Sequence, residues 1–250
     1  MPPARALHVI FCWHMHQPDY RDADGVYVLP WTYLHACKDY SDMIAHYEEN
    51  PLARGVFNCV PILIEQLEDY TAQFQSGQFR DPLLIALAME NLKALPNEQR
   101  HFLLEQCFRL DPEHMLNPFP DYRRLYDIYQ LMLEDVKEMS DYLSVQYLAD
   151  LLVWYHLAWT GETVRRGSPF LRSLFAKGHG FSQEDRQQLV HFLGELIGGL
   201  IPSTRHSRVI SSVSECRRKV SGLPKEASLP PLSKCSATPG CAGPLPVKAY

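Results

Sequence analysis

The amino-acid sequence predicts an α/β fold with a largely helical insertion, followed by a disordered tail. Two observations support this prediction. Strand-like and helix-like segments alternate over residues 7–74, and helical patterns then continue alone to about residue 202. The composition changes sharply near Pro202. We therefore divide the chain into a folded domain, residues 1–202, and a tail, residues 203–250.

Two short apolar segments have the pattern of strands. Residues 7–13 are apolar, few in number and partly β-branched, which is typical of a strand buried in a parallel sheet. Residues 56–60 form a second such segment. A loop and a helix ending near Asn50 separate the two, and Pro61 suits the first turn of another helix with one apolar face. This order is the opening of a parallel α/β fold.

The pattern is helical from Asp81 onward. Asp81 and Pro82 suit a cap and a first turn. Further helices are expected over residues 98–109, 122–138 and 143–159, from Ser168 to Gly178, and after Ser182, which has capping-box spacing to Asp185. Connections in a plain barrel are short, so this stretch reads as an insertion carried on the strand ends.

The tail differs from the rest of the chain in charge and in composition. Residues 1–202 hold 16 Lys and Arg against 27 Asp and Glu, whereas residues 203–250 hold eight against two. The tail also contains nine Ser and six Pro, and Tyr250 is its only aromatic residue. Such a segment buries too little apolar surface to offset its ordering entropy, so we expect disorder. The abrupt change favours a frameshift product over an ordinary basic tail.

The overall composition excludes several classes of protein. A net charge of -5 and a pI near 6.1 give no electrostatic basis for binding nucleic acid. No apolar stretch is long enough to span a membrane. The seven cysteines are odd in number and scattered without a CxxC pair, which argues against a disulfide framework and a zinc knuckle. We therefore expect a soluble protein in a reducing compartment, the cytoplasm.

Two histidines stand at the C-terminal end of the first predicted strand, where ligands gather in parallel α/β folds. His14 and His16 point to the same side of an extended chain, about 6.6 Å apart. Three interpretations stay open from this spacing alone. The pair could bind a metal if a third ligand came from elsewhere. It could bind a sugar, with Trp13 and Trp31 offering apolar faces. It could also be purely structural.

Three ordered segments resemble glycoside hydrolase family 57. The run FCWHMHQP at residues 11–18 resembles the first signature of that family, in which His-Gln-Pro closes the first barrel strand. The runs LPWTYLHACKDY at residues 29–40 and FNCVPILIEQL at residues 57–67 resemble the same branch of the family. The similarity extends to about Pro202.

This resemblance implies the N-terminal portion of an incomplete (β/α)7 barrel that acts on α-glucans or oligosaccharides with retention of configuration. The family needs no metal or other cofactor for catalysis, which favours the sugar site over the metal site. The residues then expected to bind substrate are His14, His16, Gln17 and Trp31. His35 and Asp39 are expected on the same rim.

The resemblance also predicts what the chain lacks. Retaining glycosidases need a nucleophile and a separate acid/base, with carboxyl groups about 5–5.5 Å apart. In the family both follow a Gly-x-(Val/Ile)-Glu strand, and nothing beyond Pro202 matches that strand. No catalytic residue is therefore assigned, and we expect this chain to be inactive. Two alternatives are a non-catalytic carbohydrate-binding relic and a metal-dependent hydrolase using His14 and His16.

Overall fold

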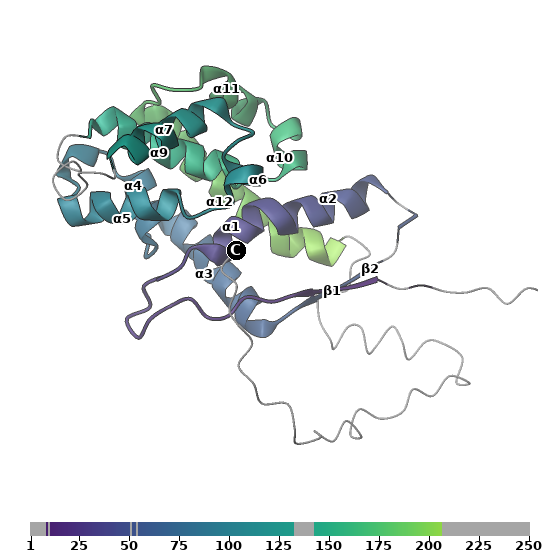
Figure 1. Ribbon diagram of the computed structural model, residues 1–250. Coiled ribbons are helices and arrows are strands. Elements are labelled where there is room, and N and C mark those ends of the chain that lie inside the picture. Colours follow the sequence, from purple (N-terminus) through teal and green to yellow (C-terminus); the bar gives the residue numbers. More distant parts are fainter. Residues whose placement is uncertain (1–8, 10, 51, 54, 133–142, 207–250) are drawn as a thin grey trace, which may run out of the picture.

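The computed structural model describes residues 9, 11–50, 52–53, 55–132 and 143–206, with side chains as far as Leu200. The described part is mostly helical, with one small sheet at its edge (Figure 1). No helix in these ranges is both long enough and apolar enough to cross a membrane.

The sheet consists of two parallel strands. β1 (Phe11–Met15) pairs with β2 (Gly55–Cys59), so that Trp13 lies opposite Phe57 and His14 lies opposite Asn58. The parallel pairing confirms the α/β opening predicted from the sequence. The described residues contribute only these two strands, so closure into a (β/α)7 barrel stays a prediction.

A continuous helical segment connects the two strands. It comprises α1 (Trp31–His35), the π-helix η1 (Ala36–Tyr40) and α2 (Ser41–Glu49). Two carbonyl groups of the π-helix accept hydrogen bonds from donors other than the usual helical amides. The Ser41 hydroxyl donates to the Ala36 carbonyl at 2.6 Å, and the Gly161 amide donates to the Cys37 carbonyl at 3.0 Å. The predicted end of this helix near Asn50 is confirmed, and the structure places the start of the segment at Trp31.

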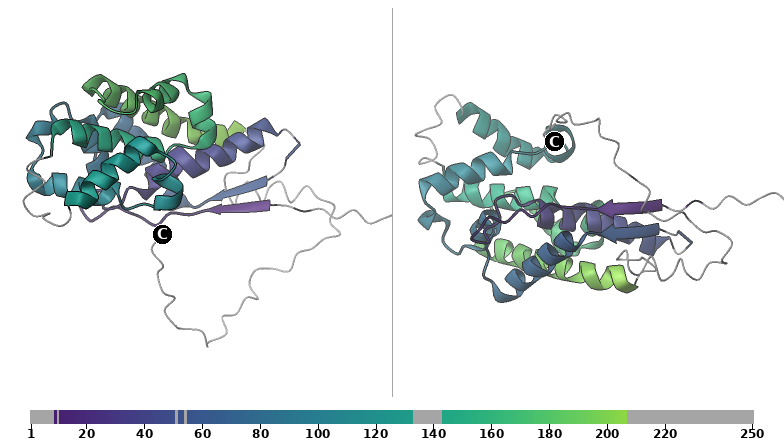
Figure 2. Two further views of the ribbon diagram at one scale, coloured as in Figure 1. Left: turned by 45° about the horizontal axis from the view of Figure 1, so that its top comes forward. Right: turned by 90° about the horizontal axis from the view of Figure 1, so that it is seen from below.

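Two long helices pack beside each other next to the sheet (Figure 2). α3 (Pro61–Ser76) begins with the predicted Pro61 and ends at Gly77, whose φ of 69° is left-handed. α12 (Gln183–His206) starts with the predicted capping box, since Ser182 and Asp185 exchange hydrogen bonds between side chain and backbone. The helices approach closely at Gly194, where a Cβ atom would lie 3.0 Å from the Cβ of Phe74.

The predicted helical insertion is confirmed. Its elements are α4 (Pro82–Ala88), η2 (Leu92–Ala94), α5 (Asn97–Cys107), α6 (Pro112–Met115), α7 (Pro120–Met132), α9 (Val145–Ala158), α10 (Glu162–Gly167) and α11 (Pro169–Lys177). The core centres on α9, in which every residue from Tyr147 to Ala158 is buried. The helices α4, α5, α7 and α12 and the short helix η2 all contact α9, which leaves none of its faces open to solvent.

The prediction of a buried first strand is wrong. Phe11, Cys12, Trp13 and His14 are all exposed, and only Met15 is buried. The helices cover one face of the sheet, where the Trp13 indole donates to the Tyr47 hydroxyl of α2 at 2.9 Å. Side chains alternate along a strand, so Cys12 and His14 lie on the opposite face. No described element covers that face (Figure 1), so Cys12 and His14 are exposed.

The last helix extends a few residues past Pro202, while the division into a folded domain and a disordered tail stays a prediction. α12 continues to His206, so residues 203–206, which the sequence assigned to the tail, are helical. The disorder predicted for the tail concerns residues 207–250, which lie outside the described residues, as do residues 133–138 of the helix predicted over 122–138.

Candidate functional site

The two histidines predicted to bind substrate lie on the surface, side by side. His14 and His16 are both exposed, and their ring centroids are 6.0 Å apart with an angle of 27° between the planes. The Asn58 amide nitrogen of β2 lies 3.0 Å from Nδ1 of His14. The amide nitrogen is a donor, so Nδ1 of His14 accepts in this contact and its Nε2 is left for another partner.

The third predicted residue, Gln17, has a different environment. Its side chain is buried, its Nε2 donates to the Tyr40 hydroxyl at 3.0 Å, and its Oε1 accepts from the Tyr20 hydroxyl at 2.7 Å. Both polar ends are thus bonded within the protein. In this structure Gln17 holds the loop after β1 against the π-helix, and contact between Gln17 and a substrate stays a prediction.

A second glutamine fixes this loop beside α1. Gln66 of α3 is fully buried, and its Nε2 donates to the Pro18 carbonyl at 2.9 Å. Its Oε1 accepts from the Thr32 hydroxyl at 3.1 Å and from the Tyr20 amide at 3.3 Å. The first turn of α1, which carries Trp31, is therefore tied to the loop that follows His16. The sequence gives no signal for this role, because Gln66 looks like any polar residue on a helix.

Trp31, the fourth predicted residue, is half-buried and belongs to an aromatic cluster. Its ring centroid lies 5.6 Å from that of Trp159 and 6.5 Å from that of His35. Trp159 is 7% exposed, and the Lys38 ammonium lies over its ring, 5.4 Å from the ring centroid. Such placement of a cation over an indole is attractive.

A charged pair borders this cluster. His35 and Asp39 are hydrogen-bonded through Nδ1 and a carboxylate oxygen, one turn apart. Burial alone would raise the pKa of Asp39, but the hydrogen bond from His35 and the positive charge of Lys38 outweigh it, so the pKa lies below its ordinary value. Asp39 is therefore an ionised acceptor at neutral pH.

The described ranges contain no group of three or more His, Cys, Asp and Glu side chains placed to hold a metal ion. The metal interpretation of His14 and His16 requires a third ligand, and this part of the chain does not provide one beside them.

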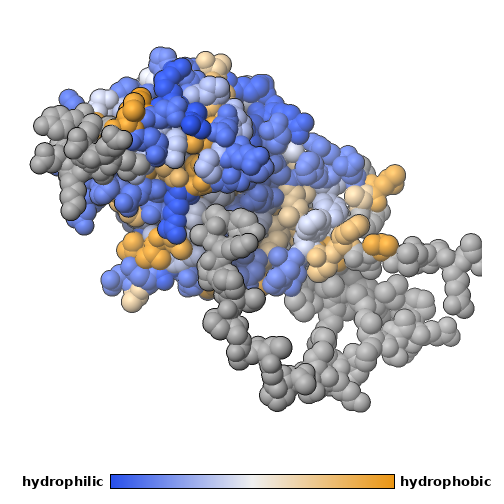
Figure 3. Space-filling view, viewed as in Figure 1, coloured by the Kyte–Doolittle hydropathy of each residue, from blue (hydrophilic) through white to orange (hydrophobic). Residues whose placement is uncertain are grey.

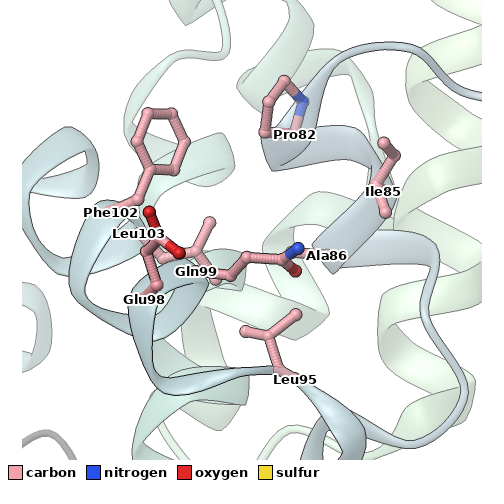
Figure 4. Close-up of a pocket in the computed structure, with 8 residues that line it drawn as sticks. All are labelled: Pro82, Ile85, Ala86, Leu95, Glu98, Gln99, Phe102 and Leu103. Atoms are coloured by element: carbon pink, nitrogen blue, oxygen red, sulfur yellow. The ribbon is translucent and has the colours of Figure 1, made fainter.

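A separate apolar cavity lies in the helical insertion, between α4 and α5 (Figure 4). It has a volume of about 440 Å³. Pro82, Ile85 and Phe102 contribute apolar surface to it, and Glu98 and Gln99 are polar groups in its lining. None of the predicted site residues lines this cavity, and it resembles a gap between helices more than a polar binding site.

Comparison with known proteins assigns the chain to a family. No curated protein and no solved structure matches it. The model of the family described as "Glycosyl hydrolase family 57" matches residues 10–205. This range includes β1, both histidines, the π-helix and nearly all of α12. Since this match covers well over half of the sequence, the chain belongs to glycosyl hydrolase family 57.

Proposed function

We propose that this chain is part of a retaining glycoside hydrolase or transglycosylase that acts on α-glucans, and that His14 and His16 bind a glucosyl unit. Membership of the family supports glycoside hydrolase or transglycosylase chemistry on glucans. The observation that carries the residue assignment is the pair of exposed imidazoles, 6.0 Å apart, on the uncovered face at the end of β1. Nε2 of His14 and the ring nitrogens of His16 can form hydrogen bonds with the hydroxyl groups of a sugar.

The proposal includes the inactivity of the chain by itself. A retaining mechanism needs a carboxylate nucleophile and a carboxylic acid about 5–5.5 Å apart. Asp19, the carboxylate nearest to His16 in sequence, is paired with Arg21, and Asp39 is hydrogen-bonded to His35. The sequence offers no counterpart of the strand that carries the family nucleophile. We therefore propose binding of α-glucan without turnover, by a protein of the cytoplasm.

The test is a titration of the purified 250-residue chain with maltohexaose, followed by calorimetry. Saturable binding is expected, and His16→Ala should weaken it about tenfold, since one or two hydrogen bonds are lost. His191→Ala is the matched control, because His191 is an exposed histidine on α12 with its side chain 77% accessible. Equal affinity of the His16→Ala variant and the wild type would contradict the site assignment.

The second candidate is a non-catalytic carbohydrate-binding relic of the barrel. The composition changes abruptly near Pro202, so the DNA beyond codon 202 distinguishes the two candidates. If the DNA beyond codon 202 encodes a Gly-x-(Val/Ile)-Glu strand and later carboxylates in another frame, the gene is a damaged or misread enzyme gene. If neither other frame encodes them, the relic is favoured. Release of reducing sugar by the pure chain would overturn the proposed inactivity in both cases.

A further inference from the structure

A groove lies where α2, α10 and α12 meet, and none of the residues predicted to bind substrate lines it. It has a volume of about 360 Å³. We call it the α12 groove. Its lining includes Ile44, Glu48 and Glu49 of α2, Val164 of α10, and Glu195 and Leu196 of α12.

Every carboxylate or other fully charged group in this lining is negative. Glu48, Glu49 and Glu195 are all exposed, and no Lys or Arg stands among the lining residues that the structure describes. His191 lies 3.5 Å from Glu195, but it is charged only when protonated. The cavity between α4 and α5 has a single carboxylate in its lining, that of Glu98. The α12 groove is therefore a place that attracts positive charge.

Two of these carboxylates stand where a helix favours cations. Glu48 and Glu49 belong to the last turn of α2, in which His46 is the only basic residue. The C-terminal end of a helix carries partial negative charge, so carboxylates there are unfavourable and a nearby cation is stabilising. A positive group brought into the α12 groove would offset this repulsion.

The α12 groove also has an apolar surface between its carboxylates. Ile44 is buried, and Val164 and Leu196 are half-buried. Lys and Arg side chains suit such a surface, because their methylene groups pack on apolar atoms while their charged ends stay in water. The chemistry of the lining thus fits a basic peptide segment better than a small inorganic cation.

The chain itself leads away from this groove. α12 passes beside α2 (Figure 1), and Leu200, six residues before the end of α12 at His206, still lines the α12 groove. With a rise of 1.5 Å per residue, His206 lies about 9 Å further along the helix. A further 44 residues follow His206 in the sequence.

These following residues carry charge of the opposite sign. Residues 207–250 hold seven Lys and Arg against two Asp and Glu. The densest basic run, Arg217-Arg218-Lys219, begins eleven residues after His206. A flexible chain of eleven residues spans on the order of 18 Å, which exceeds the distance back to Leu200. The run is therefore within reach of the groove from which the chain departs.

From these observations we infer that the α12 groove is the docking site of the chain's own tail, with residues 217–219 beside Glu49 and Glu195. The aliphatic stems of the run lie against Ile44 and Leu196. Covalent connection gives the run an effective concentration in the millimolar range, so ion pairs that individually contribute little can hold it. Salt screens such exposed pairs, so docking weakens as the ionic strength rises. Docking depends on the charges of the tail and not on how the gene came to encode it.

The experiment is zero-length cross-linking of the full 250-residue chain with a water-soluble carbodiimide, followed by mass spectrometry. The reagent activates a carboxyl group, which the amine of a nearby lysine attacks to form an amide bond while the carbodiimide leaves as a urea. At about 0.02 M salt, Lys219 should cross-link to Glu49 or Glu195 at least about fivefold more than Lys234 does, and about 0.5 M salt should remove this difference.

Two sets of variants test the partners of the run. Arg217→Gln combined with Arg218→Gln leaves Lys219 and every carboxylate in place, and it should lower the yield of the Lys219 cross-links about threefold or more. Glu195→Gln should lower the yield of the Lys219–Glu49 cross-link. Glu105→Gln is the matched control, because Glu105 is an exposed glutamate on α5, outside the groove, and it should change nothing.

The outcomes decide between the possible occupants of the groove. In a mixture of ¹⁵N-labelled and unlabelled chains, cross-links within one chain support the inference. Cross-links between differently labelled chains overturn it and place the tail of a second copy in the groove. Equal cross-linking of all lysines of the tail, or yields that neither salt nor the variants change, also overturn it. No sugar takes part, so each result leaves the proposed glucosyl site untouched.

Discussion

The amide nitrogen of Gln17 donates to the hydroxyl of Tyr40 at 3.0 Å, and this buried bond joins the loop after β1 to the π-helix. Tyr40→Phe removes the acceptor and leaves a buried N–H unpaired, which should cost about 1–3 kcal/mol of unfolding free energy. Chemical denaturation measures the loss. A double-mutant cycle with Gln17→Leu should show coupling between the two positions, and strictly additive effects would contradict a direct bond.

Asp81 should stabilise the folded protein more at acidic pH than at neutral pH, which is the reverse of what most carboxylates do. Burial raises the pKa of Asp81 from 3.8 to about 6, although the Tyr70 hydroxyl and the amides of Leu83 and Leu84 donate to it. Between these values the folded state holds a proton that the unfolded state has lost. The contribution of Asp81 is therefore fully present below about pH 4 and is lost as the pH rises through about 6.

Asp81→Asn tests this dependence, because it keeps the shape of the side chain and removes its charge. The difference in unfolding free energy, wild type minus variant, should fall by on the order of 2–3 kcal/mol between pH 4 and pH 7. Urea denaturation at several pH values measures it. A difference that stays constant or rises over this range would show that the folded pKa of Asp81 is not raised.

The capping box of α12 should contribute measurably to stability. The Ser182 hydroxyl accepts from the Asp185 amide at 3.2 Å and donates to the Asp185 carboxylate at 2.8 Å. Ser182 is exposed, so its replacement affects mainly this cap. Ser182→Ala should lower the unfolding free energy by about 1 kcal/mol. Ser173→Ala on α11 is the control, as it removes an exposed serine that is not a cap, and its effect should be within about 0.5 kcal/mol. Equal losses in both variants would argue against the cap.

The sheet should make the protein associate with itself. Val9, Phe11 and Leu52 are 64%, 60% and 93% exposed near the beginning of the strands, on the side where Figure 3 shows apolar surface. Exposed apolar strands with unpaired edges promote association, and a charge there prevents it. Phe11→Lys should therefore lower the light scattered by concentrated solutions. Leu131→Lys on α7, where Leu131 is 81% exposed, is the control. An equal reduction by both would place the association elsewhere.

Local sequence patterns were sufficient to predict both strands and the starts of the long helices. Short apolar runs predicted both strands, because a parallel sheet selects for them. Pro61 and Ser182 predicted where α3 and α12 begin, since both act through neighbouring backbone groups. The side-by-side placement of His14 and His16 follows from the alternation along a strand and is confirmed by the 6.0 Å separation of the rings.

Features that depend on distant partners could not be predicted in this way. Cys12 is exposed because helices pack against only one face of the sheet. The composition of a strand does not show which of its faces will be covered. The π-helix depends on the Ser41 hydroxyl and on Gly161, which lies more than a hundred residues away in sequence. The role of Gln66 depends on the loop at Pro18. The aromatic cluster of Trp31, His35 and Trp159 likewise forms only when α1 and the end of α9 meet in the folded chain.

The π-helix has a consequence for how the chain tolerates changes in length. Its hydrogen bonds span one residue more than those of an α-helix, so deleting one residue between Ala36 and Tyr40 would let the segment close as an ordinary helix. The helices on either side would keep nearly the same direction, because a π turn is how an α-helical segment accommodates one added residue. The effect of such a deletion therefore depends on which side chain is lost. Without Tyr40 the buried Gln17 amide has no acceptor, and without Asp39 the imidazole of His35 has no carboxylate partner.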